Sequence, residues 1–188
     1  MSRMATIFLR VKHWQLFLLL VVLWIGSGAA QFAAIPSSSG EPARAAFPFV
    51  AVGELVVLVF AGWLWSVGNF LQSVVPQRLK MSPTLFRISV ILPLLCIPLS
   101  ALVFESLNLA VVGIVFIAYG IALAGEVYSW YFVARSLALA QYSRQVRFSD
   151  YEATLLGIWF FPFGIWFIQP KINRLYAKSS ENLSLGQS

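Results

Sequence analysis

The residues of this sequence best suited to chemistry are two glutamates inside long apolar segments. Glu54 follows PFVAVG and Glu126 follows GIALAG, so each carboxyl group lies in a stretch that otherwise lacks charge. A charge in lipid is costly, and ionisable residues in such segments therefore indicate a polar role within a membrane. We expect each carboxyl to be protonated or hydrogen-bonded within a helix bundle; the alternative is an ion or proton path.

Other polar residues share helical faces with these glutamates. At 100° per residue, Glu54 aligns with Trp65 and Gln72, and Asn69 lies beside them. The residues that align with Glu126 are Asn108, Tyr119, Ala122 and Ser129. We expect both faces to point towards protein or water.

Helix rise separates the two carboxyls by about 17 Å in depth, which argues against a shared proton or a shared metal ion. At the depth of Glu126 the candidate partner is Asn69, and at the depth of Glu54 it is Ser100. No metal site and no cofactor are expected. Cys96 and His13 are the only residues of their types, so these ligands cannot form a metal cluster.

Small residues are concentrated on the same late segment as Glu126. They are Gly113, Ala118, Gly120, Ala122 and Gly125. Small side chains let membrane helices approach each other closely. Packing within one chain and self-association explain them equally well at this stage.

Composition predicts an all-α integral membrane protein. Of 188 residues, 60% are hydrophobic and 11% are charged. Apolar runs of about 20 residues are long enough to cross a bilayer as helices. We predict one domain over 1–188, with spans at about 14–32, 48–70, 83–104 and 109–134, and the last helix continuing to about Gln141.

The cations predict the orientation of these helices. Lysines and arginines gather before the first span, around Arg78 and after the fourth span, and cytoplasmic loops collect such residues. The N-terminus is therefore expected to be cytoplasmic. The net charge of +6 is explained by these membrane-flanking clusters, so we expect a lipid bilayer rather than nucleic acid as the partner.

The segment GIWFFPFGIWF at 157–167 is short for a span and contains Pro162, which we expect to act as a hinge. We predict that 150–169 is re-entrant or interfacial and is followed by a cytoplasmic tail over 170–188. This arrangement leaves twelve of the thirteen cations on one side. A fifth span is the alternative. A capping box of Ser149 and Glu152 should start the first half, and Gln169 and Pro170 should end the second.

Two short stretches resemble an uncharacterised family of small polytopic bacterial inner-membrane proteins. They are KHWQLF at 12–17 and FPFGIWFIQPKIN at 161–173. The resemblance implies a bacterial cytoplasmic membrane and no particular activity.

Three functions compete. The sequence has no HExxH, no GxSxG and no glycine-rich phosphate loop, so a non-enzymatic subunit is the leading hypothesis. Such a subunit would self-assemble or anchor a membrane or cytoplasmic partner, docking it on the segments after Arg135. The second hypothesis is a channel or small transporter that uses Glu54 and Glu126. The third is a lipid-modifying enzyme, which requires Glu126 or Glu152 to meet Arg144 or Arg147.

Overall fold

The computed structural model describes residues 7–9, 11–34, 42–105, 108–161 and 163–185. These residues form helices joined by turns, and no strand occurs among them, which confirms the all-α prediction. The helices are α2 (His13–Ala34), α3 (Pro42–Val74), α4 (Pro83–Glu105), α5 (Leu109–Tyr142), α6 (Glu152–Trp159) and α7 (Ile165–Leu185). Single 3₁₀ turns lie at Gln77–Leu79 and Phe148–Asp150.

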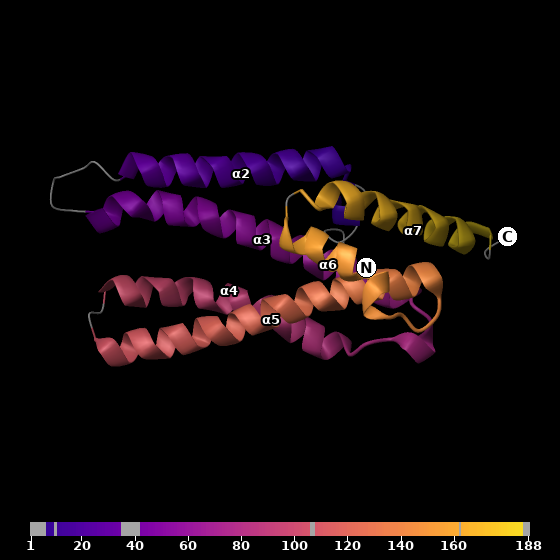
Figure 1. Ribbon diagram of the computed structural model, residues 1–188. Coiled ribbons are helices and arrows are strands. Elements are labelled where there is room, and N and C mark those ends of the chain that lie inside the picture. Colours follow the sequence, from indigo (N-terminus) through magenta and orange to yellow (C-terminus); the bar gives the residue numbers. More distant parts are fainter. Residues whose placement is uncertain (1–6, 10, 35–41, 106–107, 162, 186–188) are drawn as a thin grey trace.

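The long helices form two antiparallel hairpins, α2 with α3 and α4 with α5 (Figure 1). Helix α3 packs against α2, α4 and α5 and so joins the two hairpins. The chain then reverses between α6, which packs on α5, and α7, which packs on α2. The start of α6 and the end of α7 consequently face the same end of the bundle (Figure 1).

A close approach at Gly68 lets α4 pack tightly on α3. A Cβ atom added there would lie 2.3 Å from Cζ of Phe86, too close for any real contact. The Phe86 ring cannot move away easily, because it is buried and stacks on Phe132 of α5 with ring centroids 4.2 Å apart. Glycine at this position therefore fixes the junction of three helices.

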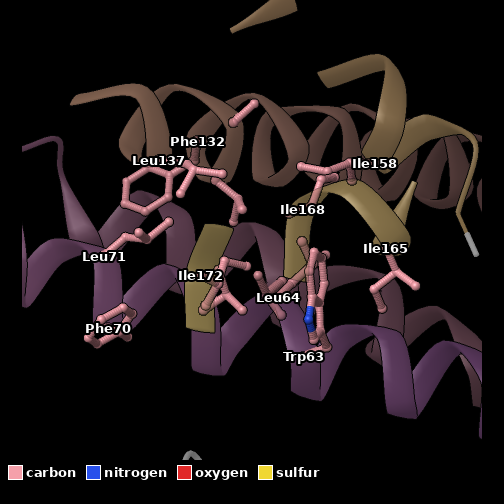
Figure 2. Packing of buried hydrophobic residues seen from close by; sticks show 14 of the residues in the cluster. Trp63, Leu64, Phe70, Leu71, Phe132, Leu137, Ile158, Ile165, Ile168 and Ile172 are labelled. Carbon is pink, nitrogen blue, oxygen red and sulfur yellow. The ribbon is translucent and has the colours of Figure 1, made fainter. Parts of the chain in front are cut away.

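The second half of the core is built on α6 and α7. Figure 2 shows Ile158 of α6 and Ile165 and Ile168 of α7 gathered over Trp63 and Leu64 of α3. The three isoleucines and Trp63 are fully or almost fully buried. The α6–α7 hairpin is thus part of the folded core and not an appendage.

Among the described residues, two helical stretches are long and apolar enough to cross a membrane, Glu54–Val74 and Leu109–Tyr142, whereas the sequence predicts four spans. The described apolar parts of α2 and α4, His13–Gly26 and Pro83–Cys96, are shorter than a span. Only 11% of the most apolar window of α5 is buried. The core helix of a soluble protein is apolar because it is buried, and α5 is apolar and exposed.

The last predicted helix end is wrong, because α7 continues through Pro170 to Leu185. Proline inside a helix removes one backbone hydrogen bond and costs about 3 kcal/mol. Here Ile168 and Ile172 are buried on either side of Pro170, and Gln169 is hydrogen-bonded inside the core. Tertiary packing therefore offsets the local preference to stop.

The predicted capping box of Ser149 and Glu152 is also wrong. Tyr151 precedes the first turn of α6, and no side chain caps that turn. Instead the carboxylate of Asp150 accepts the backbone N–H of Arg147 at 2.8 Å, within the 3₁₀ turn that comes before α6. The hydrogen bond of Asp150 thus stabilises the 3₁₀ turn before α6, and not the first turn of α6 as the sequence pattern predicts.

Candidate functional site

Glu126 is half-buried at a junction of α3, α4 and α5. It borders a cavity of about 20 Å³ together with Ser89 of α4 and Ser129 of α5. The two serine hydroxyls lie 2.8 Å apart, and the Ser129 hydroxyl is also within hydrogen-bonding distance of the Gly125 carbonyl. Most of the remaining wall is apolar. A cavity of this size has room for about one water molecule, which the Glu126 carboxyl and the two serine hydroxyls border in an otherwise apolar wall.

Asn69 does not pair with Glu126 in this structure. Its amide nitrogen donates to the Trp65 carbonyl at 2.7 Å, and its amide oxygen accepts from the Arg87 guanidinium at 3.3 Å. The Arg87 guanidinium also lies 5.9 Å from the centre of the Trp65 ring. Asn69 therefore ties α3 to an exposed cation near one end of α4.

The other predicted polar residues lie apart from this junction. The Tyr119 hydroxyl donates to the Cys96 carbonyl at 3.2 Å and joins α5 to α4. Glu54 is half-buried, and no hydrogen bond or ion pair involves it among the described residues. The side chain of Ser100 lies outside the described residues, as does the hinge Pro162, although the chain does break between Trp159 and Ile165.

The small residues of α5 separate into two sets. Ala122 is buried, and a Cβ atom on Gly125 would lie 3.3 Å from the Ser89 carbonyl oxygen, so these two residues pack against α4. Half-buried Ala118 accepts a weak hydrogen bond from Cys96 on the same side. Cβ atoms on Gly113 and Gly120 would meet nothing within 4 Å. Packing within the chain explains the first set and leaves these two glycines without a role.

Acidic and basic groups lie between the end of α5 and the start of α6. Arg144 pairs with Asp150 at 3.3 Å. The Arg147 N–H bond and, after it, the Arg144 guanidinium hold the pKa of the Asp150 carboxyl below its ordinary value. Glu152 is exposed at the start of α6, and within the described part of the chain neither Arg144 nor Arg147 pairs with it.

The part of the predicted docking surface that directly follows Arg135 is inaccessible. Four consecutive residues of α5 are buried in the bundle: Ser136, Leu137, Ala138 and Leu139. The Ser136 hydroxyl accepts from the Gln72 amide at 3.0 Å, and so fixes this turn against α3. Exposed groups at this end begin only at Gln141.

A fully buried glutamine, which the sequence reasoning missed, joins three parts of the chain. The Gln169 side-chain oxygen accepts from the Trp63 indole N–H at 2.9 Å, and its nitrogen donates to the Phe8 carbonyl at 2.8 Å. The available signal was a polar residue between Ile168 and Pro170, on the face that Ile165 and Ile172 share. Gln169 thus positions α7 against α3 and the N-terminal segment.

An aromatic pocket of about 470 Å³ lies beside this junction. Aliphatic side chains of α2 and α3 form part of its wall: Leu20, Val21, Ile25 and Val56. The rest is aromatic: Phe17, Trp24, Trp159, Phe160, Phe161 and Phe163. Four of the six aromatics come from GIWFFPFGIWF, so the α6–α7 turn builds one wall of an apolar pocket. We name this the aromatic pocket.

No family model, curated protein or solved structure matches this chain. The comparisons therefore give no support to the resemblance of the two short stretches, and function has to be inferred from geometry.

Proposed function

We propose that the protein is a non-enzymatic integral membrane subunit that self-assembles through one exposed face of α5. The observation that carries the proposal is that Gly113 and Gly120 lie on an apolar, exposed helix face with nothing within 4 Å of an added Cβ atom. Glycine inside a helix costs about 1 kcal/mol relative to alanine. Because no close contact within the described part of the chain explains this cost at Gly113 and Gly120, we infer a close contact with another molecule.

The face that contains these glycines is continuous over four turns. Residues spaced by three and four positions carry it along α5, and each is exposed: Gly113, Phe116, Ile117, Gly120, Ala124 and Val127. The opposite face carries Val115, Ala122 and Ser129, which are buried against the rest of the chain. Small residues between larger apolar ones are what a helix pair in lipid requires. The partner that we propose for this face is a second copy of this chain.

The proposed membrane arrangement has α2 to α5 crossing a bacterial inner membrane, with α6 and α7 returning to the side they came from. Both termini are then cytoplasmic. Arg78 lies in the 3₁₀ turn after α3, Arg144 follows the end of α5, and Lys178 lies in the second half of α7. The ends of α3, α5 and α7 lie at the same end of the bundle (Figure 1), which supports this orientation by the positive-inside rule.

A channel has less support than a self-assembling subunit. Glu126 faces a cavity of about 20 Å³, and the aromatic pocket contributes no acidic or basic side chain to a route. A catalytic role has less support still, because Glu152 does not meet Arg144 or Arg147 in the described part of the chain.

Cysteine crosslinking in native membranes tests the proposal. In a Cys96→Ala background, Ile117→Cys and Ala124→Cys place single thiols on the proposed face, and Ile88→Cys places a matched thiol on the exposed side of α4. We expect disulfide-linked dimers from the two α5 variants and not from the α4 control. Adding Gly120→Leu should abolish the α5 dimers. Monomers alone from Ile117→Cys and Ala124→Cys would contradict self-assembly through this face.

A further inference from the structure

We infer that the aromatic pocket holds one acyl chain of an anionic phospholipid, whose phosphate lies on exposed cations at the α7 end of the bundle. The inference rests on the membrane placement proposed above, and it is independent of self-assembly through α5. The evidence for it is the apolar lining of the pocket and the exposed cations near the pocket.

The lining of the pocket selects a hydrocarbon. The ten described side chains around it are aliphatic or aromatic, and its volume of about 470 Å³ is that of a small-molecule site. Trp24 and Phe160 are more than 60% exposed at its rim, so the space opens at the protein surface. An apolar pocket that opens within a bilayer is in contact with lipid tails. The occupant that fits such a pocket is therefore an acyl chain.

Aromatic contacts connect this pocket to the basic end of the bundle. The Phe17 ring lies 6.0 Å from Phe163 and 5.4 Å from Trp166, and Trp166 lies 4.8 Å from His13. His13 is the first residue of α2, and exposed Lys12 precedes it. A path along the protein surface thus leads from the pocket to a cation.

The exposed face of helix α7 also changes from aromatic to basic side chains along its length. Phe167 is 75% exposed, and Lys171 and Arg174 follow it at four and seven positions, both exposed. Helix rise places Lys171 about 6 Å beyond Phe167. The sequence from Phe163 to Lys178 contains no carboxylate, and neither does α2. No ion pair neutralises Lys171 or Arg174 among the residues that the structure describes.

The order of these groups, aromatic first and basic second, matches the order of acyl chain and phosphate in a phospholipid that lies beside the protein. Its acyl chain would pass Phe167 into the pocket, and its phosphate would lie at the level of Lys12, Lys171 and Arg174. Cations near a membrane surface attract anionic lipid. The headgroup preference is therefore expected to be anionic and to depend on the two α7 cations.

Native mass spectrometry of the purified full-length chain tests the inference. The protein is titrated in detergent with dioleoyl phosphatidylglycerol, dioleoyl phosphatidylcholine or oleate. We expect one phosphatidylglycerol per chain, bound roughly tenfold more tightly than phosphatidylcholine. Equal affinity for the two phospholipids would overturn the anionic assignment, and oleate binding as tightly as phosphatidylglycerol would overturn the phospholipid assignment.

Pocket-filling variants locate the site. Val21→Trp and Ile25→Trp add bulk inside the pocket, and Ile88→Trp adds bulk on the exposed side of α4, outside the pocket and the proposed self-assembly face, as a matched control. We expect the first two to lose the bound lipid and the control to keep it. Val21 is only half-buried and Ile25 is exposed, so at least one variant is expected to fold, which circular dichroism will show. Lipid retention by a folded pocket variant would overturn the assignment of the site.

A charge variant tests the binding of the phosphate separately from the binding of the acyl chain. Lys171→Gln combined with Arg174→Gln should remove the preference for phosphatidylglycerol while phosphatidylcholine still binds. An unchanged preference would overturn the placement of the phosphate. The same spectra report the oligomeric state and so distinguish the two proposals. A monomer that binds the lipid would contradict self-assembly but not this inference. A dimer that binds no lipid would contradict this inference but not self-assembly.

Discussion

The indole nitrogen of Trp63 donates to the side-chain oxygen of Gln169 at 2.9 Å, across 106 positions of sequence. Both residues are fully buried, and the Gln169 nitrogen donates in turn to the Phe8 carbonyl. One amide therefore satisfies a buried donor on α3 and a part-buried acceptor on the N-terminal segment. Because α7 carries that amide, the contact fixes the wall of the aromatic pocket.

Replacing Gln169 should destabilise the fold more than its size implies. Gln169→Leu leaves the Trp63 N–H and the Phe8 carbonyl without partners, and an unsatisfied buried polar group costs about 1–3 kcal/mol. We expect the free energy of unfolding, measured by SDS titration in micelles and followed by circular dichroism, to fall by at least that amount. Gln145→Leu, at an exposed position, is the control and should have little effect.

A double-mutant cycle with Trp63→Phe isolates the hydrogen bond. When both partners are removed, the loss should be smaller than the sum of the single losses by about 1 kcal/mol. Additive losses would mean that Trp63 and Gln169 contribute only through packing.

Gly164 is expected to be the least tolerant glycine of the α6–α7 hairpin. An added Cβ atom would lie 1.7 Å from the Gly157 carbonyl oxygen, so the two helices would have to separate. Overpacking of this kind typically costs 1–3 kcal/mol, and we expect roughly the upper end for Gly164→Ala in the same unfolding assay. Gly157→Ala should cost less, since its Cβ atom would meet the flexible end of Ile168 at 3.2 Å.

Gly113→Ala provides the matched control, because its Cβ atom would contact nothing. In micelles dilute enough to hold monomers, alanine there should be neutral or stabilise the helix by roughly 0.5–1 kcal/mol. Equal stability of Gly164→Ala and Gly113→Ala would refute the close helix approach.

Long apolar runs predicted the helices, and Pro162 predicted the break that lies between Trp159 and Ile165. The positions of Ser82 and Pro83 predicted the start of α4 as it occurs. The proline stop signal failed at Pro170, where long-range packing of Ile168 and Ile172 outweighs it. The capping-box pattern failed at Ser149, because the Arg147 N–H and the Arg144 guanidinium both bind the neighbouring carboxylate of Asp150.

The candidate site was harder to predict, because it depends on which helix faces which. The phase of α5 predicted that Glu126 and Ser129 share a face, and both border the small cavity. Nothing local indicates that Ser89 of α4 lies there and contacts Ser129. The aromatic pocket needs α2, α3 and the α6–α7 turn together. Sequence alone assigned those aromatics to the membrane boundary, since the concavity exists only once α7 has returned along α2.

Asp150 should titrate at unusually low pH. Its carboxylate accepts the Arg147 N–H and pairs with Arg144, and these interactions hold its pKa below the ordinary 3.8. Because the folded-state pKa is lowered, the turn contributes stability above pH 3.8, and this contribution is lost as the pH falls through the folded-state pKa. Asp150 is the only aspartate, so aspartate labelled with ¹³C at the carboxyl gives one resonance to follow.

Arg144→Ala should raise this titration midpoint only in part, because the Arg147 N–H remains in place. Arg78→Ala removes an exposed cation from a different turn and should leave the midpoint unchanged. A wild-type midpoint at or above 3.8 would show that the turn is not formed in solution.

The return of α7 predicts that positions 143 and 178 are labelled from the same side of the membrane. Single cysteines at Ser143 and Lys178, in a Cys96→Ala background, should react with a membrane-impermeant maleimide only after the cells are opened. Ala110→Cys, at the opposite end of α5, should react in intact cells and serves as the control (Figure 1). The reason is geometric: α6 enters beside α5, the chain turns between Trp159 and Ile165, and α7 runs back along α2. Labelling of Lys178→Cys in intact cells would make this segment a fifth span and would place the basic face of α7 outside.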